Sequence, residues 1–178
     1  MATTSLGTVL DPGYLEGLSS LPIVEVRSRR DHATEVEVGL SYLRRMIQGR
    51  LDIILAEGRR RESGDPGGDV SELVQRLPAI LGDRVRAPGT GRLPTLMAPA
   101  EPVLSELGRL DEIVDTDSLA NLPGLSDEQL RQVDAALSDF EQEVSADRRA
   151  IFEVIDRLQE EIVRRYKSGE ASVDTLLS

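Results

Sequence analysis

Two stretches of the chain carry the same polar residue types at the same spacing. The first, EVGLSYLRRMIQGRLD at 37–52, follows the pattern E-x3-S-x2-R-x3-Q-x3-D, and its five positions are Glu37, Ser41, Arg44, Gln48 and Asp52. At about 100° per residue, these five side chains would share one helix face about 80° wide. Such a continuous polar line could present several hydrogen-bonding groups to one ligand.

The second stretch, EQEVSADRRAIFEVID at 141–156, repeats four of the five positions with Glu141, Ser145, Arg148 and Asp156. Phe152 stands where the pattern has glutamine, and the arginine after each pattern arginine is also shared, as Arg45 and Arg149. Positions beside a coiled-coil core usually vary freely among Glu, Lys, Gln and Arg. Identical residue types at matched positions therefore favour a common chemical role.

These residue types are suited to a guanine nucleotide. An arginine guanidinium is a planar fork that matches a phosphate group or the O6 and N7 atoms of guanine. Aspartate or glutamate can accept hydrogen bonds from the other edge of guanine. Serine and glutamine can bind phosphate or ribose oxygens. Arginine and aspartate in each stretch could thus hold one guanine.

The first stretch lies in a predicted helix over 22–61. Pro22 suits the first turn of a helix. Apolar residues then recur every seven positions, which is the stripe of a coiled-coil helix, at Val26, Ala33, Leu40, Ile47 and Ile54. The segment ESGDPGGD at 62–69 ends this helix, because clustered glycine and proline break helices.

The second stretch lies in a predicted helix over 126–168. Ser126 and Gln129 form a capping box at its start, and Gly169 follows a basic last turn at its end. The seven-residue apolar period continues between these ends, at Leu130, Leu137, Val144, Ile151 and Leu158. Each of the two helices would have about 40 residues and a length of about 60 Å.

Two long apolar stripes in one chain most simply pack against each other. Pairing Arg61 with Asp127 and Pro22 with Ser168 gives one antiparallel register to within about one helical turn. The predicted fold class is therefore all-α: a long antiparallel two-helix coiled-coil hairpin, with short helices and loops in the connection.

The same register brings Glu37 opposite Asp156 and Asp52 opposite Glu141, so that the two polar lines face each other about a local pseudo-two-fold axis. Such a site suits a ligand that is itself two-fold symmetric. Cyclic di-GMP is such a ligand, with two guanines and two phosphates. We therefore predict that the nine pattern residues bind cyclic di-GMP, and that Arg45, Arg149 and Phe152 are additional candidates.

Composition predicts the remaining segments. Residues 1–21 are rich in Gly, Ser and Thr and are expected to be a flexible N-terminal arm. The other expected segments are a loop-rich connection over 62–125, with short helices at 69–82 and 103–122 and an open loop at 83–102, and a C-terminal tail over 169–178.

Composition also argues against several functional classes. The net charge of −11 opposes unspecific binding to nucleic acid or anionic membranes. Cysteine is absent and the single histidine, His32, is expected at the surface, so neither a metal site nor thiol or Ser-His catalysis is predicted. A helix flank encloses no pocket, so we assign no catalytic residue and predict no enzyme. Without a long apolar run, the protein is predicted to be soluble and cytoplasmic.

The five-residue pattern resembles the signature of the RsiG-type anti-sigma factors of actinobacteria. The first stretch carries this signature complete, and the second departs from it only at Phe152. The resemblance extends to two long helices joined by a loop-rich middle.

This resemblance implies a function. The chain would bind cyclic di-GMP as a regulatory ligand, with no other cofactor, through the nine matching residues. In that state it would sequester WhiG, a sporulation sigma factor similar to the flagellar FliA-like sigma factors, and block transcription of its regulon. The partners would be the sigma factor and the nucleotide, with no nucleic acid and no membrane. A monomeric hairpin would form a heterodimer with the sigma factor and release it when the nucleotide level falls.

Two other interpretations stay open. The polar lines could be solvated helix flanks with ion pairs between successive turns, in a structural or adaptor coiled coil without a nucleotide ligand. A weaker alternative is a coiled-coil partner of some other nucleic-acid enzyme. Alanine at Arg44 or Asp52 separates the adaptor from the nucleotide-binding protein, and the protein that co-purifies with the chain tests the last alternative.

Overall fold

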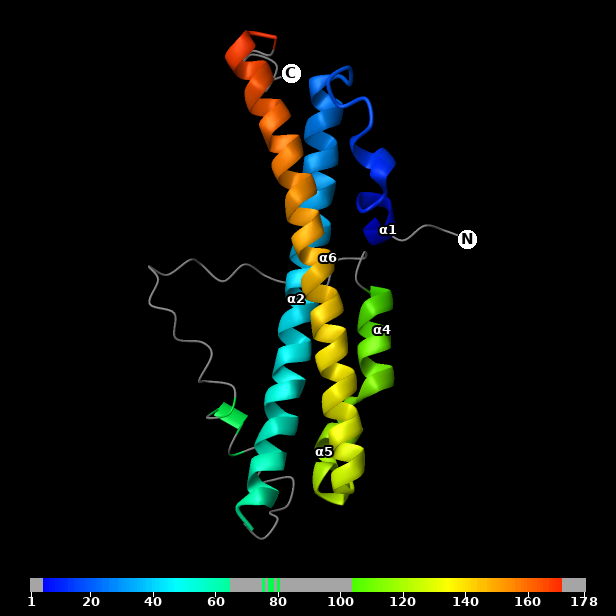
Figure 1. Cartoon of the computed structure of the whole chain (residues 1–178), viewed down its shortest axis with the longest axis vertical. Coiled ribbons are helices and arrows are strands. Elements are labelled where there is room, and N and C mark those ends of the chain that lie inside the picture. The colour runs from blue at the N-terminus through cyan, green and yellow to red at the C-terminus, as the bar shows by residue number, and fades with distance from the viewer. Residues whose placement is uncertain (1–4, 65–74, 76, 79, 81–103, 171–178) are drawn as a thin grey trace. The chain divides into compact units, whose positions relative to one another are not determined.

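The computed structural model describes residues 5–64, 75, 77, 78, 80 and 104–170. The described elements are all helices, among them the short 3-10 helices η1 and η3: α1 (Ser5–Val9), η1 (Pro12–Leu15), α2 (Ile23–Glu62), α4 (Leu104–Ile113), α5 (Thr116–Ala120), η3 (Leu122–Gly124) and α6 (Asp127–Ser168) (Figure 1). The fold is an all-α helical hairpin based on α2 and α6, as the sequence predicts. Both long helices begin one residue after their predicted starts.

The chain divides into two compact units, and each contains part of both long helices. Among the described residues, the first unit holds α2 up to Ser41, α6 from Ser145 and the N-terminal segment. The second unit holds α2 from Tyr42, α6 up to Val144, and the short helices α4 and α5. The compact units therefore do not coincide with the consecutive segments that the sequence predicts.

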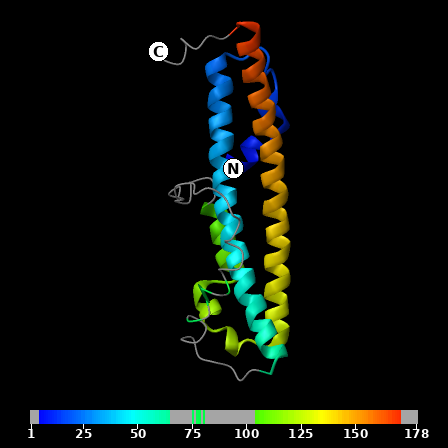
Figure 2. The same cartoon turned by 90° about the vertical axis from the view of Figure 1, so that its left-hand side faces the viewer.

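In each unit a segment of α2 lies beside a segment of α6 (Figures 1 and 2). The predicted apolar stripes form both seams, and none of their ten residues is more than 6% exposed. Phe140 and Ile162 extend the buried stripe of α6. Burial of a large aliphatic side chain contributes about 1.5–3 kcal/mol, so these seams supply much of the stability of each unit.

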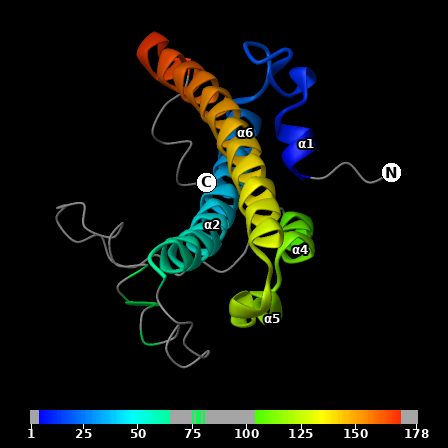
Figure 3. The ribbon, with the colours of Figure 1, turned by 60° about the horizontal axis from the view of Figure 1, so that its bottom comes forward.

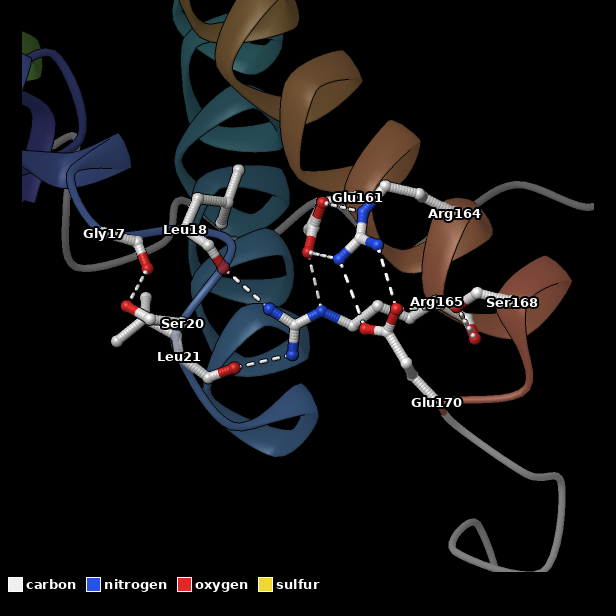
Figure 4. Close-up of polar contacts among 9 residues, drawn as sticks. All are labelled: Gly17, Leu18, Ser20, Leu21, Glu161, Arg164, Arg165, Ser168 and Glu170. Atoms are coloured by element: carbon white, nitrogen blue, oxygen red, sulfur yellow. Dashed lines mark hydrogen bonds and ion pairs between the residues drawn. The ribbon is translucent and has the colours of Figure 1, made fainter.

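Contacts at the helix ends confirm the antiparallel register. In the second unit Arg61 Nη1 donates to Asp127 Oδ1 at 2.7 Å, which is one of the two predicted pairings. In the first unit Arg165 near the end of α6 donates to the carbonyl oxygens of Leu18 and Leu21, just before α2 begins (Figure 4). The length and caps of the two helices are thus sufficient to set how they align.

The predicted capping signals operate at both ends of α6. The backbone N–H of Ser126 donates to Gln129 Oε1 at 2.8 Å, and the backbone N–H of Gln129 donates to Ser126 Oγ at 3.2 Å. At the other end Gly169 has a φ of 77°, which favours glycine, and its N–H donates to the carbonyl of Tyr166. These local bonds satisfy groups that a helix end leaves without partners.

The two long helices also share a second motif, E-x2-R-R, near their C-terminal ends. In α2, Glu57 is 5% exposed and accepts from both Arg60 and Arg61. In α6, Glu161 accepts from both Arg164 and Arg165 (Figure 4). The second arginine of each motif reaches the chain beyond its own helix, since Arg61 donates to the Leu122 carbonyl at 2.8 Å and Arg165 donates to the Leu18 carbonyl at 2.7 Å.

The N-terminal segment differs from the flexible arm expected at 1–21. Residues 5–15 include α1 and η1, and Val9 is fully buried. The Tyr14 hydroxyl donates to the Arg29 carbonyl at 2.8 Å and lies 3.2 Å from Nδ1 of His32, which is half-buried rather than at the surface. The prediction from composition missed these contacts because single residues, here Val9 and Tyr14, anchor a segment that is otherwise rich in Gly, Ser and Thr.

The predicted helix at 103–122 corresponds to α4 and α5 in the second unit. Buried Arg50 of α2 donates to the Leu110 carbonyl at 2.9 Å and to the Val114 carbonyl, at the C-terminal end of α4. Figure 3 shows α4 beside the first half of α6. The helix expected at 69–82 and the loop expected at 83–102 fall outside the described residues, apart from four isolated positions.

No helix in the described part of the chain is both long and apolar enough to cross a membrane.

Candidate functional site

In the first unit, Arg148 of α6 meets Glu37 and Ser41 of α2. Arg148 Nε donates to Glu37 Oε1 at 2.8 Å and to Ser41 Oγ at 2.7 Å. The Ser41 hydroxyl in turn donates to the same glutamate oxygen at 2.7 Å. The guanidinium carbon of Arg148 also lies 4.9 Å from the centre of the Phe152 ring. Pattern residues from both stretches therefore form one connected cluster.

In the second unit, Arg44 of α2 meets Glu141 of α6. Arg44 Nε donates to Glu141 Oε1 at 2.8 Å, and Gln48 Nε2 donates to the same oxygen at 3.1 Å. The arginine of each stretch is thus bonded through Nε to the glutamate of the other stretch. The two units repeat one arrangement, an arginine–glutamate pair across α2 and α6.

Both pairs are partly shielded from solvent. The Glu37 and Glu141 side chains are 13% and 19% exposed, whereas Arg148 and Arg44 are 32% and 37% exposed. In the part of the chain that the structure describes, hydrogen bonds from Arg148 use Nε alone. Its Nη1 and Nη2 groups therefore have donors that a bound ligand could use.

The two glutamates of the pattern bond to arginines of the partner helix, Glu37 to Arg148 and Glu141 to Arg44. An arginine side chain is long enough to reach along the partner helix to a carboxylate. The placement of Glu37 opposite Asp156 and of Asp52 opposite Glu141 stays a prediction.

The other candidates lie around these pairs. Ser145 is half-buried, and its carbonyl accepts from Arg149 Nε at 3.3 Å. Asp52 is half-buried and engaged in an interaction, whereas Asp156 is exposed. Arg45 and Arg149 are both exposed, so neither belongs to the shielded part of the arrangement.

The sequence left the role of Phe152 undecided, and in the structure its ring lies beside the guanidinium of Arg148. The two residues are four positions apart on α6, a spacing that places side chains on the same helix face. A cation beside an aromatic face is attracted by the ring. That spacing is the sequence signal that could have identified the contact.

Each arginine–glutamate pair offers a donor fork beside an acceptor. A guanine presents the complementary set, because O6 and N7 accept hydrogen bonds while the N–H groups of its other edge donate them. A phosphate could instead take only the arginine. Among the residues that the structure describes, no three His, Asp or Glu side chains converge as ligands of a metal ion.

The model of the family described as RsiG-like matches the chain over residues 12–81 and 116–178. These two stretches contain every residue of the repeated pattern and the whole of both long helices. Among curated proteins, none is similar enough in sequence to count as a relative. Because the family match covers well over half of the sequence, the chain belongs to the RsiG-like family.

Proposed function

We propose that the chain binds cyclic di-GMP and, in that state, sequesters a sporulation sigma factor of the WhiG/FliA-like kind. An anti-sigma role and a sigma factor as partner follow in general from the RsiG-like family. The proposal adds the nucleotide, the kind of sigma factor and the resulting block on transcription of its regulon. Because a sigma factor acts in the cytoplasm, the proposal places the protein there.

One observation carries the nucleotide part of the proposal. In each unit an arginine and a glutamate of the repeated pattern meet across α2 and α6, at the same Nε-to-Oε1 distance of 2.8 Å. The flanks of a structural coiled coil also form ion pairs between helices, but they vary freely among Glu, Lys, Gln and Arg and need no identical residue types at matched positions of both helices. Each pair comes from two helices, is partly shielded and is complementary to one guanine, so each supports recognition of a guanine nucleotide.

The mechanism follows from the two helices that supply each pair. A nucleotide bound to Arg148 and Glu37, or to Arg44 and Glu141, contacts α2 and α6 together and favours the helix arrangement that fits the sigma factor. Linkage then requires that the nucleotide raise the affinity for sigma factor as much as sigma factor raises the affinity for nucleotide. The nucleotide is a ligand rather than a substrate, and the protein is not an enzyme.

Isothermal titration calorimetry tests the proposal directly. The wild-type chain should bind cyclic di-GMP, and it should bind more tightly when the sigma factor is present. Arg44→Ala or Arg148→Ala should lower the nucleotide affinity at least about tenfold, because hydrogen bonds to charged groups contribute about 1.5–3 kcal/mol. Arg131→Ala is the matched control, since that side chain is 72% exposed and remote in sequence from the pattern.

The absence of nucleotide binding both to the chain and to its complex with sigma factor would overturn the proposal. If the affinity for sigma factor changes neither with the nucleotide nor with the Arg44→Ala substitution, a structural or adaptor coiled coil would be favoured. Far-ultraviolet circular dichroism of each variant shows whether its helix content is unchanged, so that a loss of affinity can be separated from a loss of folded structure.

A further inference from the structure

The second unit contains an apolar pocket that the proposed nucleotide site does not use. It has a volume of about 330 Å³ and lies at the end of α4, beside α5 and the first turns of α6. Apolar side chains line most of it: Ile113, Val114, Leu125, Val133 and Ala136. Its size and lining are suited to one or two aliphatic side chains.

Carboxylates are frequent in the segment that supplies part of the pocket lining. Between Arg109 and Arg131 the chain has six Asp or Glu residues and no Lys or Arg. Three of the six, Glu112, Asp115 and Asp117, are exposed and form no ion pair with a residue that the structure describes. They adjoin the lining residues Ile113, Val114 and Ser118 in sequence. These three exposed carboxylates, which we call the negative rim, are thus next in sequence to residues of the apolar pocket.

The pocket wall is firmly held in place. Buried Arg50 bonds to the carbonyl oxygens of Leu110 and Val114 and forms an ion pair with Asp111. On the other side of α4, Arg109 forms two hydrogen bonds to Glu143, at 2.9 and 2.6 Å. Because α4 is attached to both long helices, the pocket is a formed feature of the second unit.

None of the residues that line the pocket belongs to the repeated pattern. Ile113 and Val114 fall between the two stretches of the family match, and the other six lining residues lie in its second stretch. The repeated pattern therefore does not account for this pocket.

We propose that the pocket is a docking site for a basic amphipathic helix of the sigma factor. An aliphatic side chain of that helix enters the pocket, while its Lys or Arg residues face Glu112, Asp115 and Asp117. Charge complementarity selects this occupant, because a protein that binds DNA must carry basic surface. The negative rim repels nucleic acid and anionic lipid. The inference rests on the sigma-binding part of the proposed function and is independent of the nucleotide.

Site-specific photo-crosslinking identifies the occupant. Gln132 lines the pocket and is exposed, so a benzoylphenylalanine introduced there would contact whatever enters. Irradiation of the purified complex should join this position to the sigma factor, at a segment rich in Lys and Arg. Crosslinks confined to the chain itself, or to a second copy of it, would overturn the inference.

Charge neutralisation tests the rim. The triple variant Glu112→Gln, Asp115→Asn, Asp117→Asn should bind the sigma factor about tenfold more weakly at low salt and with less salt dependence. Asparagine preserves the cap at position 115, where Asp115 accepts from the backbone N–H of Ser118. The control variant Glu16→Gln, Glu35→Gln, Asp139→Asn removes the same charge from exposed positions elsewhere. Equal affinities of the two triple variants would contradict the inference.

Filling the pocket gives an independent test. Ala136→Gln places a longer polar side chain in the lining of the pocket at a helical position that accommodates glutamine. The variant should lose at least about tenfold in sigma affinity while it keeps its helix content and its nucleotide binding. Unchanged sigma affinity would overturn the docking site alone. A wild-type chain that binds no sigma factor would overturn the proposed function as well.

Discussion

Gln48 and Phe152 occupy the same position of the repeated pattern and contact their charged pairs differently. Gln48 shares the carboxylate oxygen that Arg44 uses, with Nε2 3.1 Å from Glu141 Oε1. Phe152 cannot donate, and its ring instead lies beside the guanidinium of Arg148. Each residue thus orients one partner of its pair: glutamine acts on the glutamate, and phenylalanine acts on the arginine.

A prediction follows at this scale for nucleotide binding. Phe152→Ala should weaken cyclic di-GMP binding about two- to fivefold, because an exposed cation–π contact contributes about 0.5–1 kcal/mol. Phe152→Gln should recover most of the loss, since it restores the donor that the pattern has at Gln48. Calorimetry of both variants checks this, with Val163→Ala as a control at an equally exposed apolar position of α6. Equal affinity of Phe152→Ala and wild type would show that the ring only covers the helix surface.

At the scale of the elements, the E-x2-R-R motifs hold the ends of the long helices. Hydrogen bonds from Arg164 and then Arg165 lower the pKa of Glu161 to about 2. Hydrogen bonds from Arg60, with a further contribution from Arg61, lower the pKa of Glu57. In both motifs the carboxylate fixes an arginine that also bonds to backbone carbonyls outside its own helix.

The lowered pKa of Glu161 predicts how acid destabilises the first unit. The unfolded chain takes up a proton at this carboxyl near the ordinary value of 4.5, whereas the folded chain resists protonation down to about 2. The stabilisation is therefore complete above about pH 4.5 and is lost as the pH falls through about 2. Thermal unfolding followed by circular dichroism should show Glu161→Gln less stable than wild type at pH 7, with a difference that shrinks toward pH 2.

Glu160→Gln is the control for this experiment, because the neighbouring carboxylate is exposed. Its difference from wild type should stay small at every pH. A Glu161→Gln difference that does not change between pH 7 and pH 2 would contradict the role assigned to the ion pairs.

At the scale of the whole molecule, the chain combines buried seams with a strongly acidic surface. All ten seam positions that the heptad pattern predicts are buried within their own units. The net charge of −11 adds repulsion between copies. Neither the burial of the seams within each unit nor the net charge favours a coiled coil between two chains.

The purified chain alone should therefore be a monomer. Size-exclusion chromatography with multi-angle light scattering should give a mass near 19.5 kDa, independent of concentration in the micromolar range. Twice this mass would indicate that the stripes, or the apolar pocket at the end of α4, pair two copies. Ala136→Gln would then separate these causes, since only pairing through the pocket depends on that position.

Much of this architecture could be predicted from the sequence. The seven-residue period identified the seams, the capping box and Gly169 bounded α6, and the pairing of Arg61 with Asp127 gave the register. These features depend on local backbone preference and on the number of residues in each helix, and both follow from the amino-acid sequence alone. The repeated polar pattern likewise depends only on spacing.

Only the tertiary structure decided which side chains meet. Glu37 bonds to Arg148, because an arginine can reach a carboxylate of the partner helix only once the two helices lie together. In the N-terminal segment Val9 is buried and Tyr14 bonds to the Arg29 carbonyl, 15 residues away, and α4 is held by Arg50, 60 residues away from Leu110. Periodicity in one helix carries no information on such partners. The sequence by itself thus determined two long helices, their register and the candidate residues, whereas contacts between elements decided the arginine–glutamate pairs and the apolar pocket at the end of α4.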